Sequence, residues 1–217
     1  MPAQHEIAEG LRFDSFAPGY DENQEQNQIR TKIREEAVAL IRQLKPRIVV
    51  DVGCGTGKAL VALSETITTG TGLDVSPKML DVARRNATSA GCGNLEFHFG
   101  SFLDLETRTF WPTDRAPDVV MQTYALHHLP REEKRRALAC MANAVRAVRG
   151  NVILGDLMFF EPPVGLEHEF SLVGYDPNTD LPETADTLAQ MLEHLGFSVQ
   201  CFPMHPLAGV IVAGLAP

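Results

Sequence analysis

The stretch Ile48-Val-Val-Asp-Val-Gly-Cys-Gly-Thr-Gly57 decides how this chain can fold. Its first five residues, four of them apolar, are typical of a buried parallel strand. The glycines that follow tolerate positive φ and carry no Cβ, so a ligand can approach the main chain closely. A helical pattern starts at once, at Lys58, and its free N–H groups would point toward such a ligand. Strand, glycine turn and helix in this order predict a nucleotide-type site at the carboxyl edge of a sheet.

The spacing of the glycines separates this site from two common nucleotide motifs. Gly53, Gly55 and Gly57 give G-x-G-x-G, whereas the dinucleotide fingerprint is G-x-G-x-x-G and a Walker loop requires G-x-x-x-x-G-K-[ST]. A second acid, Asp74, ends the short predicted strand 71–74. In this position a carboxylate would bind a ribose with two free hydroxyls.

Strand and helix patterns alternate along most of the chain. The predicted helices cover residues 26–44, 58–65, 77–90, 130–148 and 184–195. The predicted strands cover residues 48–52, 71–74, 95–99, 118–122, 151–154, 197–202 and 207–213. This alternation predicts an α/β fold with a doubly wound, mostly parallel seven-stranded sheet, whose last strand is antiparallel.

Two segments stand outside the alternation. Residues 1–24 are polar and are predicted to be irregular, although they contain Phe13, Phe16 and Tyr20. Residues 156–182 are too long for an ordinary connector. The aromatic residues of this second segment are Phe159, Phe160, Phe170 and Tyr175. We expect residues 1–217 to form a single domain, with 1–24 as a lid and 156–182 as a substrate-pocket loop over the carboxyl edge of the sheet.

These motifs together resemble the class I S-adenosylmethionine-dependent methyltransferases, whose fold is Rossmann-like. The resemblance rests on Asp51-x-Gly-x-Gly-x-Gly57, on Gly72-Leu-Asp-Val-Ser-Pro-Lys-Met-Leu80, and on residues 117–129 and 192–199, in the order of the family. It implies S-adenosyl-L-methionine as cofactor and S-adenosyl-L-homocysteine as product. It is specific for the superfamily and not for a substrate.

The resemblance also implies which residues contact the cofactor. The implied residues are Tyr20, Asp51, Gly53, Cys54, Gly55, Asp74, Val75, Ser101, Phe102, Gln122 and Thr123. Asp74 would accept hydrogen bonds from both ribose hydroxyls, Val75 would pack against adenine, and Asp51 would orient the glycine loop or the cofactor amine. Many members carry Asp where this chain has Ser101, so either Ser101 or Asp104 would contact the adenine amine.

Few catalytic residues are expected, because the methyl donor is already activated and the acceptor needs mainly alignment and deprotonation. Tyr20 lies in a Tyr-Asp segment that resembles the start of many small-molecule members. His127 is a candidate general base, and His128 is a weaker one. No metal site is predicted, because His127, His128 and Asp156 show no ligand spacing.

The charge and the fourth-strand motif favour a small-molecule acceptor. The formal net charge of −9 gives no general attraction for phosphate backbones, so a nucleic acid partner is disfavoured. Gln122-Thr-Tyr-Ala stands where [N/D]-P-P-[Y/F] would indicate amino methylation of bases. Two alternatives stay open, a non-catalytic S-adenosylmethionine-binding protein and a carboxyl methyltransferase for a carrier-protein-bound acyl group. The second would need a basic docking face, for which Arg131, Lys134, Arg135 and Arg136 are available.

The cysteines and the hydropathy favour a cytoplasmic location. The four cysteines are scattered without a C-x-x-C pair, and residues 1–10 are polar, unlike a signal peptide. No run approaches the ~18 apolar residues of a membrane span, so no membrane partner is expected. The acceptor atom and the oligomeric state cannot be read from the sequence, and a homodimer stays open.

Overall fold

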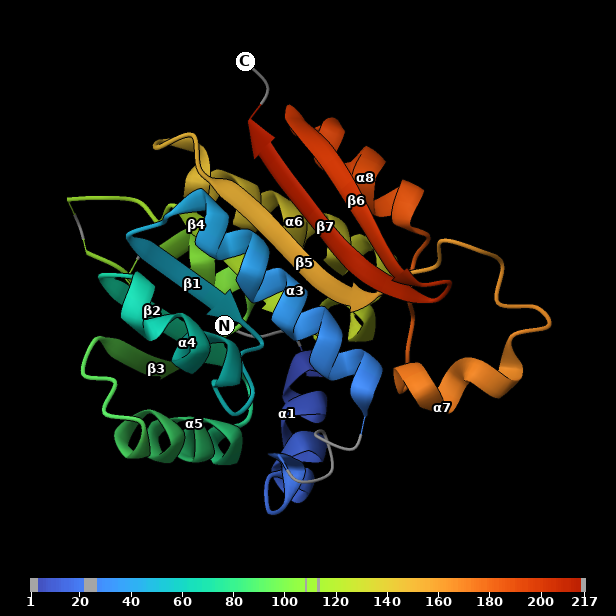
Figure 1. The fold of residues 1–217 in the computed structure, drawn as a ribbon, viewed down its shortest axis with the longest axis horizontal. Coiled ribbons are helices and arrows are strands. Elements are labelled where there is room, and N and C mark those ends of the chain that lie inside the picture. The colour runs from blue at the N-terminus through green and yellow to red at the C-terminus, as the bar shows by residue number, and fades with distance from the viewer. Residues whose placement is uncertain (1–3, 22–26, 108, 113, 216–217) are drawn as a thin grey trace.

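Seven strands form one sheet in a computed structural model that describes residues 4–21, 27–107, 109–112 and 114–215 (Figure 1). The strands are β1 (Ile48–Val52), β2 (Thr69–Asp74), β3 (Leu95–Phe99), β4 (Val119–Thr123), β5 (Asn151–Leu157), β6 (Phe197–His205) and β7 (Ala208–Leu215). The helices are α1 (Gln4–Phe16), α3 (Gln28–Leu44), α4 (Lys58–Leu63), α5 (Pro77–Ser89), α6 (Arg131–Arg146), α7 (Phe170–Val173) and α8 (Ala185–Glu193). Short 3₁₀ segments cover Ser64–Thr66, Phe102–Thr107, Leu126–His128 and Glu167–Glu169. None of the helices in the described ranges is long and apolar enough to cross a membrane.

The strand order is β3-β2-β1-β4-β5-β7-β6. The pairs from β3 through β5 are parallel, and β7 is antiparallel to both β5 and β6. The predicted doubly wound sheet with an antiparallel last strand is therefore confirmed. The order reverses between β1 and β4, and this reversal is where open α/β sheets bind their ligands.

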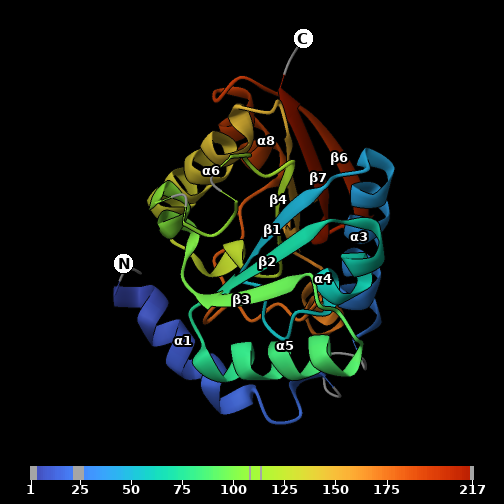
Figure 2. The ribbon, with the colours of Figure 1, turned by 90° about the vertical axis from the view of Figure 1, so that its left-hand side faces the viewer.

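Helices cover both faces of the sheet, and each face has its own apolar core. Helices α3, α4 and α5 pack on one face, and α6 and α8 pack on the other (Figure 2). The sheet centre is buried on both sides: all five residues of β1 are buried, and so are six of the seven residues of β5. Such double coverage explains why these strands are nearly continuous apolar runs in the sequence.

The prediction that residues 1–24 are irregular is wrong for residues 4–16, which form α1. Contacts with α5 hold this helix. Asp14 Oδ1 accepts hydrogen bonds from Ser76 Oγ at 2.6 Å and from the backbone N–H of Lys78 at 3.1 Å, so it caps α5 from outside. Gly10 lies so close to β2 that an added Cβ would be 2.3 Å from the Val75 carbonyl oxygen. Helicity here depends on docking, which a sequence pattern does not reveal. Predicted positions 1–3 and 22–24, and residue 26 of the next helix, lie outside the described residues.

The segment 156–182 also differs from the prediction. Asp156 and Leu157 belong to β5, because they pair with Gly209 and Ala208 of β7. The rest is not a bare loop, since it contains α7 and a backbone bridge from Phe159 to Thr184. The aromatic residues expected to form an acceptor wall pack instead against the cores, with ring centroids 5.6 Å apart for Phe159–Tyr175 and 4.7 Å for Phe170–Tyr175.

The Gly10 contact predicts that Gly10→Ala loosens α1 from the sheet. Alanine favours an isolated helix by about 0.8–1 kcal/mol over glycine, so propensity alone would stabilise α1. The backbone oxygen of Val75 leaves no room for the methyl group, and we expect faster hydrogen exchange across residues 7–16. Gly93→Ala is the matched control, since an added Cβ there has no neighbour within 4 Å. Unchanged or slower exchange in Gly10→Ala would contradict the close docking.

Candidate functional site

The glycine turn after β1 is built by contacts with two other strands. Gly53 has φ 72°, and an added Cβ would lie 2.4 Å from the Ala125 Cβ just beyond β4, so only glycine fits. The backbone N–H groups of Gly53 and Cys54 donate to the Leu73 carbonyl of β2, at 2.8 and 3.0 Å. Gly55 has φ 52°, and the side where its Cβ would stand is open. The turn therefore presents bare main chain to the space above the sheet.

Asp74 connects this turn to the start of α5. Its Oδ2 accepts a hydrogen bond from the Gly55 N–H at 2.8 Å, and its Oδ1 accepts one from the Ser76 N–H at 2.8 Å. Burial raises the pKa of Asp74 to about 6, although these backbone hydrogen bonds favour the charged form. Only 8% of the residue is exposed, so the carboxylate can meet a ligand only from the cavity side.

Asp51 is a second buried acid behind the same turn. Neither of its carboxylate oxygens has a hydrogen-bond partner among the described residues, and the residue is fully buried. Burial, and secondarily the nearby Asp74 charge, raise the pKa of Asp51 to about 8. Asp51 is therefore mostly protonated at neutral pH. It lies behind the cavity wall and not on it.

A cavity opens above the glycine turn, at the carboxyl ends of β1, β2, β3 and β4. Its empty space of about 1070 Å³ includes solvent at its open mouth. The predicted cofactor residues that line it are Tyr20, Gly53, Cys54, Gly55, Asp74, Val75, Ser101, Phe102 and Thr123. Three predicted site residues, Asp51, Gln122 and His127, do not line it.

Gln122 and His127 are instead bonded inside the wall. Gln122 Oε1 accepts hydrogen bonds from the backbone N–H groups of Ala125 and Leu126, and its Nε2 donates to Asp156 Oδ2 at 3.0 Å. His127 is 1% exposed, and its Nδ1 is 2.5 Å from Asp156 Oδ1. His128, by contrast, lines the cavity. The turn after β4 thus places the second histidine, and not the first, at the cavity wall.

Ser101 and Asp104 form a local turn. Asp104 Oδ2 accepts hydrogen bonds from the Ser101 backbone N–H at 3.0 Å and from the Ser101 hydroxyl at 3.3 Å. Ser101 lines the cavity and Asp104 does not. Of the two alternatives for an adenine contact, Ser101 has the cavity position, with Asp104 fixing its orientation.

The segment after α1 closes one side of the cavity. Asp21 accepts hydrogen bonds from Thr56 Oγ1 at 2.6 Å and from Asn86 Nδ2 at 3.0 Å, and Lys58 Nζ lies 3.5 Å from it. These contacts bring the neighbouring Tyr20 to the glycine turn. Burial raises the pKa of Tyr20 above its usual value, so its hydroxyl is protonated at neutral pH.

The sequence prediction missed several cavity residues. These are Glu9 and Phe13 from α1, Arg30 and Arg34 from α3, Lys58 and Met79 from the starts of α4 and α5, and Tyr124 after β4. The Arg30 guanidinium lies over the Tyr124 ring, 4.5 Å from its centroid. Arg30 and Arg34 are spaced i, i+4, so they share one helix face. This spacing is the sequence feature that could have identified them as a pair. Tyr124 has φ 55°, a strained conformation often found at functional sites.

Asp51→Asn tests the electrostatic cost of this burial. A carboxyl whose pKa is raised on folding stabilises the fold while it is protonated, and that contribution is lost as pH rises from about 4 toward 8. We expect the unfolding free energy of the parent to fall across this range by on the order of a few kcal/mol more than that of the variant. Urea unfolding measured at both ends of the range gives the difference. Asp81→Asn on exposed α5 is the control, and equal pH dependence in the parent and Asp51→Asn would contradict the buried, protonated carboxyl.

Comparisons with known proteins agree with this geometry. A family model described as "Methyltransferase domain" matches residues 49–147. A protein of Bacillus pumilus named "Uncharacterized methyltransferase" is 26% identical over 213 residues, which cover 93% of this chain and 94% of the relative. A demethylmenaquinone methyltransferase of Listeria monocytogenes is 32% identical over 123 residues, 54% of this chain and 50% of the relative.

A solved structure shares the fold. Magnesium protoporphyrin IX methyltransferase from Synechocystis, with bound S-adenosylhomocysteine, superposes with a TM-score of 0.65 at 18% identity, over 86% of this chain and 83% of that chain. In its sheet order, in the G-x-G-x-G turn between β1 and α4 and in these matches, the chain is similar to the class I S-adenosylmethionine-dependent methyltransferases.

Proposed function

We propose that this chain transfers the methyl group of S-adenosylmethionine to a small-molecule acceptor. One observation carries the proposal: Asp74, the open side of Gly55 and the half-buried lid residue Tyr20 all line the same cavity. The bare main chain of the turn and the Asp74 carboxylate fit an amino acid group and a ribose, respectively. The polar groups of this cavity wall therefore suit a nucleoside with an amino acid tail.

Each part of the cavity wall has a role in this proposal. Asp74 accepts from the ribose hydroxyls, while Val75, Met79 and Phe102 provide apolar contact for adenine. Arg30 and Arg34 stand where they can pair with the methionine carboxylate. The cofactor supplies an activated methyl group, so the chain has mainly to align the acceptor and exclude water. Tyr20 and Phe13 close over this space, and their roles in catalysis or exclusion of water are part of the proposal.

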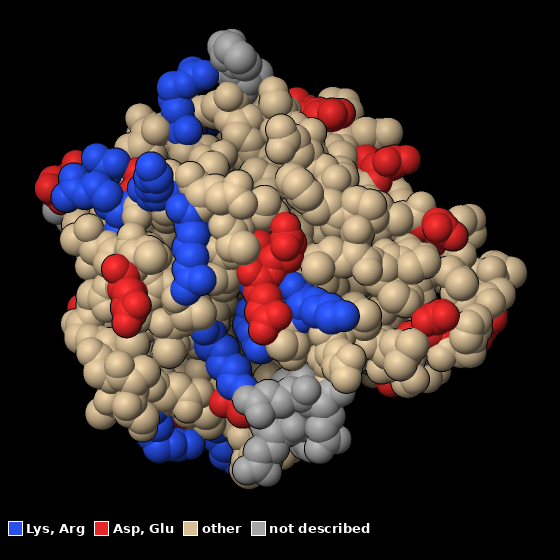
Figure 3. Space-filling model, in the orientation of Figure 1, with Lys and Arg blue, Asp and Glu red and all other residues tan. Residues whose placement is uncertain are grey.

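A small-molecule acceptor is supported by charge and by the relatives. The acceptors named for two similar proteins, demethylmenaquinone and magnesium protoporphyrin IX, are small molecules. On the face drawn in Figure 3, lysine and arginine side chains stand beside aspartate and glutamate instead of forming one continuous basic surface. Together with the net charge of −9, this does not favour nucleic acid. The four free thiols agree with the expected cytoplasmic location.

The carrier-protein alternative loses one of its expected docking residues. Lys134 is buried, and its Nζ donates to the backbone carbonyls of Leu129 and Leu181. Arg131 and Arg135 do line a groove with α8, but they lie 3.7 Å from Glu183 and 3.6 Å from Glu132, respectively. A partly neutralised groove is a weaker site for an acidic carrier than the basic face expected from the sequence.

A labelling experiment separates the three functions. The protein is incubated with methyl-labelled S-adenosylmethionine and a cell extract, and the small-molecule and protein fractions are analysed by mass spectrometry. Label in a small molecule, absent with Asp74→Ala, supports the proposal. Label on a protein-bound acyl group favours the carrier alternative. Binding of S-adenosylhomocysteine without any labelled product favours a non-catalytic binding protein.

Asp74→Ala should weaken S-adenosylhomocysteine binding by about 1.5–3 kcal/mol, the scale of hydrogen bonds to a charged group. Calorimetry measures this difference, and Asp81→Ala, on the exposed side of α5, is the matched control. Asp74 also accepts hydrogen bonds from the Gly55 and Ser76 N–H groups, and Asp74→Asn keeps one acceptor oxygen. The S-adenosylhomocysteine affinity of Asp74→Asn should therefore lie between those of the parent and Asp74→Ala. Unchanged affinity in Asp74→Ala would remove Asp74 from the site.

The lid proposal predicts that S-adenosylhomocysteine slows hydrogen exchange in residues 7–21. Glu9, Phe13 and Tyr20 all line the cavity, so a ligand beneath them should hold α1 in place. In residues 156–182 only the surroundings of Asp180 should respond, since Asp180 lies 3.2 Å from the cavity residue His128 and no described residue of this segment lines the cavity itself. Helix α8 serves as the internal reference. Equal exchange with and without ligand in residues 7–21 would show that this segment is a fixed wall.

A further inference from the structure

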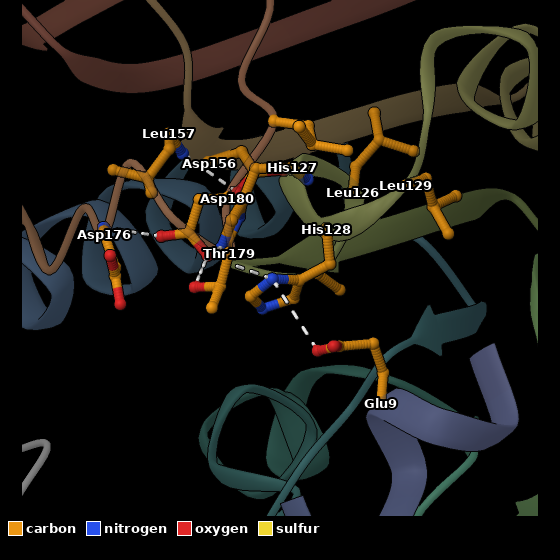
Figure 4. Close-up of polar contacts among 12 residues, drawn as sticks. Glu9, Leu126, His127, His128, Leu129, Asp156, Leu157, Asp176, Thr179 and Asp180 are labelled. Carbon is orange, nitrogen blue, oxygen red and sulfur yellow. Dashed lines mark hydrogen bonds and ion pairs between the residues drawn. The ribbon is translucent and has the colours of Figure 1, made fainter. Parts of the chain in front are cut away.

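A cluster of two histidines and two acids lies beside the cavity, where three distant segments meet (Figure 4). His127 and His128 come from the turn after β4, Asp180 from the chain before α8, and Glu9 from α1. His128 Nδ1 is 3.2 Å from Asp180 Oδ1 and 3.9 Å from Glu9 Oε2. Asp180 is 6% exposed and His127 is 1% exposed, so most of the cluster is shielded from water.

The bonding of His127 leaves one ring nitrogen directed into this cluster. Its Nδ1 lies 2.5 Å from Asp156 Oδ1. Asp156 also accepts from the N–H groups of His127, Leu157 and Gln122, so its oxygens act as acceptors and this network assigns the proton of the contact to His127 Nδ1. His127 Nε2 then presents a lone pair, and it has no hydrogen-bond partner within the described part of the chain. Asp180 Oδ1, another acceptor, is 3.9 Å away.

Asp180 Oδ1 accepts a hydrogen bond from the Thr179 hydroxyl at 3.1 Å, whereas the buried His127 Nε2 has no donor, so a cation placed between these two acceptors would satisfy the imidazole nitrogen. The nearest buried cation, Lys134, does not fill this position, because its Nζ donates to the carbonyls of Leu129 and Leu181.

The distances suit coordination of one ion. Zinc bonds of ~2.0–2.1 Å to histidine nitrogen and carboxylate oxygen place neighbouring ligands of a tetrahedron about 3.3 Å apart. The separations of 3.2 Å and 3.9 Å to Asp180 Oδ1 lie on either side of this value, and ligand atoms of His127, His128 and Asp180 all fall within 4.8 Å of one another. Small side-chain adjustments would bring them to a common centre.

We propose that His127 Nε2, His128 Nδ1 and Asp180 Oδ1 form a binding site for a divalent transition-metal ion of the zinc type, with Glu9 as a fourth ligand. Two imidazoles and a carboxylate are the donors such ions prefer. The outer shell is already in place: Asp156 orients His127, and the Asp176 N–H donates to Asp180 Oδ2 at 2.9 Å. The ion ties α1 to the turn after β4 and to the chain before α8.

This site is independent of the proposed methyl transfer, because the ion binds without cofactor or acceptor. The sequence did not reveal it, since the third ligand is Asp180, far along the chain, while Asp156 has the outer-shell position. The ion reaches the cluster from the cavity side, where His128 and Glu9 form part of the wall.

Cobalt(II) titration of the chelator-treated full chain tests the proposal, since Co²⁺ substitutes for zinc and its visible absorption reports low coordination by nitrogen and oxygen. We expect one equivalent to bind and Zn²⁺ to displace it. Asp180→Asn should lower Co²⁺ affinity at least about tenfold, and the outer-shell variant Asp156→Asn should lower it ~10–100-fold. His98→Gln, an exposed histidine beside Glu96, controls for surface binding and should have no effect.

Glu9→Gln provides a variant outside the buried cluster, in case the buried variants fail to fold. It should weaken Co²⁺ binding and change its visible spectrum, with circular dichroism unchanged. Absence of stoichiometric Co²⁺ binding by the parent would overturn the proposal and leave a proton between His127 and Asp180. Equal loss of affinity in His98→Gln, or full affinity in folded Asp180→Asn, would overturn it as well. None of these readouts depends on methyl transfer, so either proposal can fail without the other.

Discussion

The Asp74 carboxylate is the contact on which the site depends, because one buried group fixes two chain reversals. One oxygen holds the Gly55 N–H of the turn after β1, and the other holds the Ser76 N–H at the start of α5. The neighbouring Leu73 carbonyl binds the Gly53 and Cys54 N–H groups. The end of β2 thus shapes the ligand-facing main chain of β1. If Asp74 binds the ribose as proposed, one residue serves both ligand binding and the local structure of the turn.

The central architecture was predictable because its determinants are local. An apolar run followed by G-x-G-x-G can hardly form anything but a strand and a tight turn, and Ser76-Pro77 specifies a helix start. Helix α1 was not predictable in this way. Its structure depends on Gly10 against Val75 and Asp14 against Ser76, contacts that connect residues more than 60 positions apart. Gly10 permits this docking, since any larger residue would meet the Val75 carbonyl.

The candidate site shows the same division. Residues in the glycine turn, at Asp74 and at Ser101 follow from short motifs, and they line the cavity. The residues of the predicted acceptor wall do not line the cavity and pack against the core instead. The aromatic content of a long segment does not distinguish a pocket from a core. Which of two adjacent histidines meets the cavity depends on Asp156, 29 residues beyond His127, through a bond that turns the first ring inward. Tertiary contacts determine these side-chain orientations, and a local sequence pattern does not predict them.

Two buried acids, Asp51 and Asp74, make up one part of the mixed-charge surroundings of the cavity. Asp51 and Asp74 are buried near one another, and the charge of Asp74 helps to raise the pKa of Asp51. Holding both as carboxylates without a ligand is unfavourable, since each is desolvated and they repel. In the proposed function, the ammonium group of the cofactor would offset this repulsion. S-adenosylmethionine carries a sulfonium charge in addition, which is lost when the methyl group leaves. In the proposed function, the charge of Asp74 would therefore favour the sulfonium-bearing donor over the product.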